Sequence, residues 1–125
     1  MLVLSIDTAT TDLVTGVVDT ESGAVSERII TDTRAHNEQL IPTIQCLLEE
    51  KGMGFADLDA IVVGCGPGPF TGLRVGMATA SALGDALGIP VHGVCSHDAI
   101  AAEYGADKRI LVATDAPVSY THLTL

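Results

Sequence analysis

Residues 60–88 limit the possible folds more than any other stretch, because they combine an apolar run, a glycine-proline turn and a long helical segment. Residues 60–63, rich in β-branched side chains and without polar alternation, predict a strand that is covered on both faces. In residues 64–69 three glycines permit backbone angles closed to other residues, whereas two prolines fix φ. We therefore expect this turn to hold one shape.

Small residues recur at every fourth position of the helix that follows, whose first turn Thr71 is predicted to cap. A glycine inside a helix costs about 0.5–1 kcal/mol relative to alanine, so this pattern needs a compensating interaction. The small-residue ridge consists of Gly72, Gly76, Ala80, Gly84 and Gly88.

Three interactions could compensate for the cost of the ridge. The helix could pack closely on its own sheet, it could pack closely against a helix of another chain, or the preceding turn could bind phosphate. Only Arg74 and Asp85 carry charge between Thr71 and Gly88. A helix with so few charges is short of solubilising groups on any face turned to water, which favours a covered outer face and hence a partner.

The composition predicts one layered α/β domain. Hydrophobic residues make up 47% of the 125 positions and aromatic residues only 3%, so Val, Ile, Leu and Ala must build the core. Sixteen acidic and six basic residues give a formal net charge of -10, which repels phosphate backbones and anionic membranes. We therefore expect no direct nucleic-acid binding by this chain alone, and an RNA-related role would need a basic partner.

Cysteine usage and hydropathy indicate a soluble cytoplasmic protein. Cys46, Cys65 and Cys95 are odd in number and widely spaced, which predicts neither a disulfide framework nor a thiolate zinc site. No apolar run reaches the length of a membrane span, and the N-terminus has no basic signal-peptide region.

Hydrophobic periodicity predicts the element order β-β-β-α-β-α-β-α-β, with a single helical turn at 55–58 before the fourth strand. Three antiparallel strands followed by right-handed parallel crossovers give a five-stranded mixed sheet with helices on both faces, the ribonuclease-H-like layout of actin-like ATPase domains. Pro42 predicts a kink or a delayed start in the first helix. The predicted strands of the sheet are 2–6, 13–18, 25–31, 60–63 and 91–94, and a last strand is predicted at 110–114. The predicted helices begin near Asn37, Thr71 and Ser96.

The predicted domain comprises residues 1–116. Residues 117–125 continue no pattern cleanly, so we interpret them as a tail that need not be native and assign them no function.

Nuclease chemistry is poorly supported. A nuclease of this layout needs several carboxylates around two divalent metals. Asp7 ends the first strand, but the fourth strand ends in Gly64 and Cys65, where another carboxylate is required. We interpret Asp7 as a turn residue that bonds its own backbone.

The segment 7–11 lies where actin-type ATPases wrap a loop around phosphates. Such loops have glycine where backbone amides touch the anion, whereas Ala9 stands here. We predict a vestigial phosphate loop formed by Asp7, Thr8, Thr10 and Thr11, and no cofactor. The later glycine-rich turn matches neither the Walker A pattern nor the dinucleotide fingerprint.

No metal site or catalytic residue is predicted. His36, His92 and His97, alone or with Cys65 or Cys95, show no established ligand spacing. No serine lies in a G-x-S-x-G elbow.

Several stretches resemble the TsaB (YeaZ) family from about residue 2 to 116: residues 4–10, His36 with 40–42 and 47–48, 66–76, and 88–94. The stretch GPGPFTGLRVG at 66–76 is highly specific, while the first-strand motif is shared more widely among actin-like ATPase folds. The resemblance implies the N-terminal half of an accessory subunit for threonylcarbamoyl transfer to the adenosine beside the tRNA anticodon. Family members are nearly twice this length and carry a second actin-like half.

The resemblance also implies partners. Family members are not the catalyst; they pair with the paralogous transferase TsaD, self-associate through the first two helices of this half, and are joined by the small TsaE ATPase. TsaD carries a His-x-x-x-His metal motif, whereas here His36 is followed at the matching distance by Leu40. We predict a partner interface made of His36, Leu40, Ile44, Gly72, Val75, Gly76, Thr79, Ala80 and Leu83.

Two other interpretations stay open. The first is an autonomous ATPase or metallopeptidase of the actin-like fold, in line with the glycoprotease label of some relatives, for which these residues supply no mechanism. The second is a self-contained homodimer without an enzyme partner.

Overall fold

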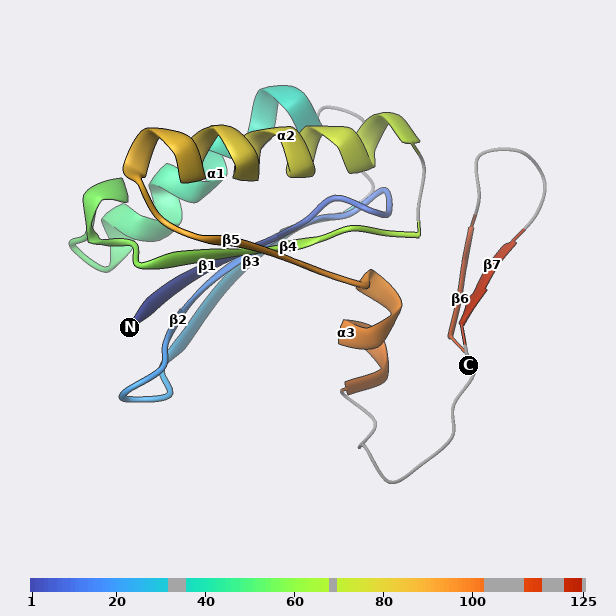
Figure 1. Ribbon diagram of the computed structural model, residues 1–125, viewed down its shortest axis with the longest axis horizontal. Coiled ribbons are helices and arrows are strands. Elements are labelled where there is room, and N and C mark those ends of the chain that lie inside the picture. Colours follow the sequence, from blue (N-terminus) through green and yellow to red (C-terminus); the bar gives the residue numbers. More distant parts are fainter. Residues whose placement is uncertain (32–35, 68–69, 103–111, 116–120, 125) are drawn as a thin grey trace.

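The computed structural model describes residues 1–31, 36–67, 70–102, 112–115 and 121–124. Five strands form one mixed sheet in the order β3-β2-β1-β4-β5, so the predicted α/β fold class and five-stranded sheet are confirmed. Helices α1 and α2 lie together over one face, and α3 lies on the opposite side (Figure 1). The elements are β1 (Leu2–Asp7), β2 (Leu13–Asp19), β3 (Val25–Ile30), α1 (His36–Glu50), β4 (Ala60–Gly64), α2 (Phe70–Leu87), β5 (Val91–Val94) and α3 (Ser96–Ala102).

Strand pairing follows the predicted meander and crossovers. β1 pairs antiparallel with β2, and β2 pairs antiparallel with β3. β4 pairs parallel with β1 on one side and with β5 on the other. The carboxyl ends of the three parallel strands therefore meet at one edge of the sheet, where Asp7, Gly64 and Val94 end β1, β4 and β5.

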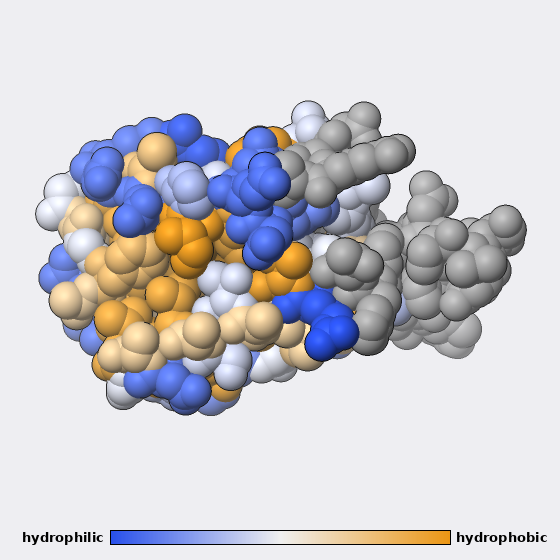
Figure 2. Space-filling model, turned by 90° about the horizontal axis from the view of Figure 1, so that it is seen from above, coloured by the Kyte–Doolittle hydropathy of each residue, from blue (hydrophilic) through white to orange (hydrophobic). Residues whose placement is uncertain are grey.

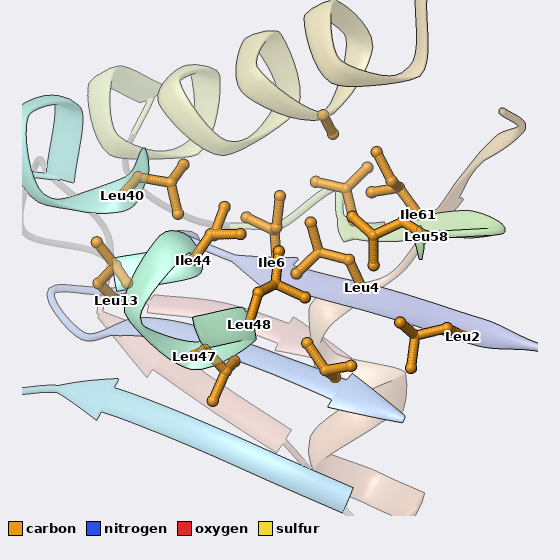
Figure 3. Close-up of a cluster of buried hydrophobic side chains, with 13 residues drawn as sticks. Leu2, Leu4, Ile6, Leu13, Leu40, Ile44, Leu47, Leu48, Leu58 and Ile61 are labelled. Atoms are coloured by element: carbon orange, nitrogen blue, oxygen red, sulfur yellow. The ribbon is translucent and has the colours of Figure 1, made fainter. Parts of the chain in front are cut away.

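The core lies between the sheet and the two helices above it. Side chains alternate between the faces of a strand, so Leu2, Leu4 and Ile6 of β1 all point toward the helices, where at most 8% of each residue's surface is exposed. In Figure 3 the side chains of Ile44 and Leu48 of α1 lie beside Ile6 of β1. The core cluster comprises Leu2, Leu4, Ile6, Leu13, Val17, Leu40, Ile44, Leu47, Leu48, Leu58, Ile61, Val63 and Ala80.

The helix boundaries differ from the prediction in two places. α1 begins at His36 and contains Pro42, so of the two predicted alternatives the delayed start is wrong and the kink stays a prediction. α2 begins at Phe70, which places Thr71 inside the first turn rather than at its cap. A short 3-10 helix, η1 (Phe55–Asp57), matches the predicted single turn. Within the described ranges no helix has the length and apolar content needed to cross a bilayer.

The C-terminal strands form a sheet of their own. β6 (Val112–Asp115) overlaps the strand predicted at 110–114, of which residues 110–111 lie outside the described residues. It pairs antiparallel with β7 (Thr121–Thr124), a strand that the sequence pattern did not predict, and joins no strand of the main sheet.

Candidate functional site

The loop after β1, predicted to be a vestigial phosphate loop, is held by its own side chains. The Asp7 carboxylate oxygen Oδ1 accepts a hydrogen bond from the Ala9 amide at 2.8 Å, which confirms Asp7 as a turn residue bonding its own backbone. The Thr10 hydroxyl accepts one from the Asp12 amide at 3.2 Å. Thr11 is exposed. These local bonds fix the loop without any ligand.

Thr8 joins the loop to helix α2. Its hydroxyl donates to the Gly72 carbonyl at 2.6 Å and accepts from the Gly76 amide at 3.1 Å. An α-helix joins these two backbone groups by its own hydrogen bond, so the Thr8 side chain bridges one step of the helical ladder. Thr8 is 1% exposed, and both hydrogen-bonding roles of its hydroxyl are used inside the chain.

His36 holds the same loop from the start of α1. Its Nε2 lies 3.1 Å from the Thr10 carbonyl oxygen. Because a carbonyl oxygen only accepts hydrogen bonds, this ring nitrogen is the donor. The His36 ring also lies close to Gly72, where an added Cβ would stand 3.7 Å from it. The loop is therefore clamped between the first turns of α1 and α2.

Gly76, Ala80 and Gly84 of the ridge face the chain's own sheet and the loop after β1, so the prediction that they are open to a partner is wrong, whereas Gly88 at the end of the ridge is exposed. A Cβ on Gly76 would overlap the Thr8 hydroxyl, and one on Gly84 would overlap Val91 of β5. Ala80 is fully buried in the core cluster. The ridge is bare because the sheet and the loop after β1 approach the helix closely, which was the first of the three explanations.

Most other predicted interface residues belong to the interior of the domain. Leu40 and Ile44 are 1% and 0% exposed, so neither can contact a partner without unfolding α1. Their helical spacing marks the core-facing stripe of α1. Val75 and Leu83 are partly buried against that same core, and Thr79 is half-buried. The ridge and the residues beside it therefore pack α2 against the sheet.

The surface left for a partner is the outer face of α1 and α2. Ile41 and Met77 expose 36% and 40% of their surface, and Figure 2 shows apolar residues gathered over this side of the molecule with hydrophilic residues around them. From the sequence, Met77 was already expected to flank the partner contact, whereas Ile41 was missed. The available signal for Ile41 was its position one residue beyond the core residue Leu40. The exposed residues of the outer face of α2 are Arg74, Met77, Ala78, Ser81, Ala82, Asp85 and Ala86.

The turn after β4 uses its first amides within the chain. The Cys65 amide donates to the Val94 carbonyl at 2.8 Å, and the Gly66 amide donates to the Ser96 hydroxyl at 3.2 Å. A phosphate would need such amides pointing outward. Residues 68–69 of this turn lie outside the described residues.

Gly64 has a definite role at the end of β4. A Cβ at this position would overlap the Asp7 carboxylate and lie 2.8 Å from the Ser96 hydroxyl. Asp7 therefore packs over a bare backbone. Among the residues that the structure describes, no three His, Cys, Asp or Glu side chains are grouped as metal ligands.

Comparison with known proteins identifies the family. Residues 24–119 match the family model described as TsaD: tRNA N6-adenosine threonylcarbamoyltransferase. An uncharacterised protein of Mycobacterium tuberculosis is 55% identical over 115 residues, which are 91% of this chain and 54% of the relative. TsaB of Escherichia coli, named a tRNA threonylcarbamoyladenosine biosynthesis protein, is 33% identical over 120 residues, 93% of this chain and 51% of the relative.

A solved structure agrees. YeaZ from Pseudomonas aeruginosa has a TM-score of 0.87 to this chain at 28% identity, covering 96% of this chain and 57% of that one. The chain thus spans about half the length of these relatives. The resemblance inferred from the glycine-proline stretch is confirmed. The chain belongs to the TsaD family, and within it to the TsaB (YeaZ) proteins.

Proposed function

We propose that this chain is a non-catalytic accessory subunit that pairs with the TsaD transferase for threonylcarbamoyl transfer to the tRNA adenosine beside the anticodon. The kinship with E. coli TsaB, whose name refers to this modification, supports the reaction. In the proposal TsaE joins the assembly, and the isolated chain pairs with a second copy through the same surface.

The observation that carries the proposal is the outer face of α1 and α2. This face combines the exposed side chains of Ile41 and Met77 with alanines of α2 at 78, 82 and 86. Small residues let a partner helix come close, and methionine is enriched at protein interfaces. Arg74 and Asp85 are the only charged residues of α2, so most of its outer face can be desolvated without burying a charge.

The arrangement of the loop after β1 supports a non-catalytic role. The Thr8 hydroxyl bonds α2, and the Asp7 carboxylate bonds the Ala9 amide. The Thr8 hydroxyl and the Asp7 carboxylate, which an actin-type ATPase would turn toward phosphate, here stabilise the fold, and the Thr10 hydroxyl accepts a hydrogen bond from the Asp12 amide. The net charge of -10 further supports a division of labour in which another subunit binds the tRNA.

The test is co-purification with TsaD followed by a threonylcarbamoylation assay with and without this chain. Ala82→Glu places a charge on the outer face of α2, and Ala24→Glu makes the same change in the exposed turn between β2 and β3. We expect Ala82→Glu to lower TsaD binding and modification at least tenfold, because a carboxylate would be buried without a partner. Ala24→Glu should behave like the parent chain.

Equal TsaD binding by both variants would contradict the proposed interface. Gly76 is unsuitable for this test, because its substitution alters the packing against Thr8. Calorimetry addresses the rival enzyme: clear ATP or divalent-metal binding by the isolated chain would contradict a purely accessory role. Self-association that survives Ala82→Glu would show that copies pair through another surface.

A further inference from the structure

The strand β3 forms one edge of the main sheet, and no described strand pairs with its outer side. It pairs with β2 continuously from Ile30 to Val25, without a bulge. Proteins usually protect such an edge with proline, lysine or a bulge, or by keeping the strand very short. β3 has six residues and none of these devices, whereas the opposite edge strand, β5, has four residues and includes Gly93. β3 is therefore the better template for an added strand.

The hairpin between β2 and β3 shows which backbone groups point to the outer side. The Asp19 amide donates to the Ala24 carbonyl at 2.9 Å, so these two residues form a hydrogen-bonded pair. In an antiparallel ladder such pairs alternate with pairs that are not hydrogen-bonded. The amide and carbonyl groups of alternate β3 residues therefore point away from β2, namely those of Val25, Glu27 and Ile29. An extended peptide can bind to such outward groups by strand addition.

A groove of about 460 Å³ lies between β3 and α1. Ile30 of β3 and Pro42 and Cys46 of α1 are among its lining residues, and the lining is mostly apolar. The Thr43 hydroxyl, which also lines the groove, donates to the Gln39 carbonyl at 2.6 Å, so its proton is already used within α1. Because side chains alternate along a strand, a strand added to β3 would place every second side chain on the side of this groove.

The charges around the groove favour a basic peptide. Arg28, the one cation among the described lining residues, forms an ion pair with Glu50 at the end of α1. The exposed carboxylate of Glu38 lines the groove, and Glu27 is exposed near the middle of β3. Because Glu50 neutralises Arg28 within the chain, an incoming peptide meets a negative surface on a molecule of charge -10.

A second copy of this chain is a poorer occupant than a basic peptide. Residues directly opposite in antiparallel strands have their side chains on the same face of the sheet. Symmetric pairing of two β3 strands along their length therefore sets Glu27 opposite Glu27 of the second copy, or Arg28 opposite Arg28 of the second copy. Like charges directly opposite destabilise a sheet.

We propose that the outer side of β3 binds an extended basic peptide segment of a partner protein by strand addition. The peptide backbone pairs with the outward amide and carbonyl groups of β3, and aliphatic side chains at alternate positions enter the groove beside α1. Basic side chains between them lie near Glu27 on the open face of the sheet, the face opposite α1 and α2. The site does not depend on the interface proposed for TsaD, because Ile41 and Met77 do not line the groove.

The probe is a synthetic peptide in which valine alternates with lysine, and the readout is the alkylation rate of cysteines in the full chain. Cys46 is exposed and lines the groove, so bound peptide should slow its alkylation, whereas the exposed Cys65 after β4 should react at an unchanged rate. Two matched peptides serve as controls. N-methylation of the lysine amides removes backbone donors, and exchange of lysine for glutamate reverses the charge, so each should bind at least tenfold more weakly.

Two substitutions at one position separate the backbone from the charge. Glu27→Pro removes an outward amide and leaves the ladder to β2 intact, since proline is tolerated where an edge strand turns its N–H to solvent. Glu27→Thr removes the same charge and keeps the amide. Peptide binding should fall at least tenfold for Glu27→Pro and by about threefold or less for Glu27→Thr. Circular dichroism confirms folding of each variant before binding is measured.

Unchanged alkylation of Cys46 at saturating peptide would overturn the proposal, as would equal binding of the plain and N-methylated peptides by the parent chain. Self-association that Glu27→Pro abolishes would also overturn it, because a second copy would then occupy the edge. Ala82→Glu, on the surface proposed for TsaD, should bind the peptide like the parent chain, so the two proposals fail separately.

Discussion

The two faces of the main sheet are built from alternate residues of the same strands and differ in cover. On the helix side of β1, Leu4 and Ile6 are 0% and 2% exposed. On the other side, Ser5 and Asp7 of the same strand are half-buried and line an open hollow. The face under α1 and α2 forms the hydrophobic core and so contributes most of the domain's stability. The opposite face carries aliphatic residues that nothing in the described structure fully covers.

The ridge of α2 belongs to the first face. Position 76 requires glycine because the Thr8 side chain occupies the space that a Cβ would fill. Position 84 requires glycine because the Val91 side chain occupies the corresponding space. A stripe of small residues on a helix therefore indicates that another part of a protein packs closely against it. The stripe does not show whether that neighbour belongs to the same chain or to a partner. The outer face of the same helix carries the side chains that a partner could reach.

The largest expected effect is on the free energy of unfolding, and it compares a buried residue of α1 with an exposed residue of the same helix. Ile44→Ala should lower the free energy of unfolding by about 2–5 kcal/mol, because Ile44 is fully buried and leaves a cavity. Ile41→Ala, three residues earlier on the same helix, should cost about 1 kcal/mol or less. Urea denaturation measures both. Similar losses for the two variants would mean that α1 is not seated as described.

The second prediction reverses the usual sign of a helix substitution. Replacing glycine by alanine inside a helix normally stabilises it by about 1 kcal/mol. Gly76→Ala should instead destabilise the domain by about 1–3 kcal/mol, because the new methyl group overlaps the hydroxyl of Thr8. Thr8 cannot swing away without losing two hydrogen bonds. A rise in the urea midpoint would show that the ridge is not in close contact.

Local patterns made most of the fold predictable. The uninterrupted apolar run at 60–63 and the single turn at 55–58 were recognised from the sequence, because periodicity and turn residues act over a few positions. The stripe of Leu40 and Ile44 was equally visible, but its helical spacing marks burial and does not say against what. Both residues therefore belong to the core instead of a partner interface.

The environment of the ridge could not be predicted in the same way. Its neighbour Thr8 lies 68 positions from Gly76 in the sequence, and the contact exists only after β1, β4 and α2 have assembled. The open face was also hidden, since a strand pattern shows that residues alternate but not which side later elements cover. Asp7 was correctly interpreted as a turn residue because an Asx turn is local.

A third prediction compares the two faces directly. Val17 of β2 is fully buried on the helix side, and Val25 of β3 is 62% exposed on the open side. Val17→Thr should cost about 1–3 kcal/mol, because the nearly isosteric change buries a hydroxyl in an aliphatic site. Val25→Thr should change stability by about 0.5 kcal/mol or less. If Val25→Thr were as costly as Val17→Thr, the face described as open would be covered in solution.

The smallest expected effect concerns the turn that joins β2 to β3. β3 is an edge strand, and all of its residues are partly or fully exposed. The Asp19 carboxylate accepts hydrogen bonds from the Glu21 amide at 3.0 Å and the Ser22 amide at 3.5 Å. The bond from the Glu21 amide, with a smaller contribution from the Ser22 amide, lowers the pKa of Asp19 below its ordinary value of 3.8. The charged form therefore stabilises the folded turn.

Because the folded-state pKa is depressed, this stabilisation is present in full above about pH 5 and is lost as the pH falls through the folded-state pKa, below 3.8. Asp19→Asn should unfold at a slightly lower urea concentration than the parent chain at pH 7, and the gap should narrow at pH 3. Asp85→Asn on the exposed side of α2 is the matched control. If the difference in urea midpoint between Asp19→Asn and the parent chain were the same at both pH values, the charge of Asp19 would not contribute to the stability of the turn.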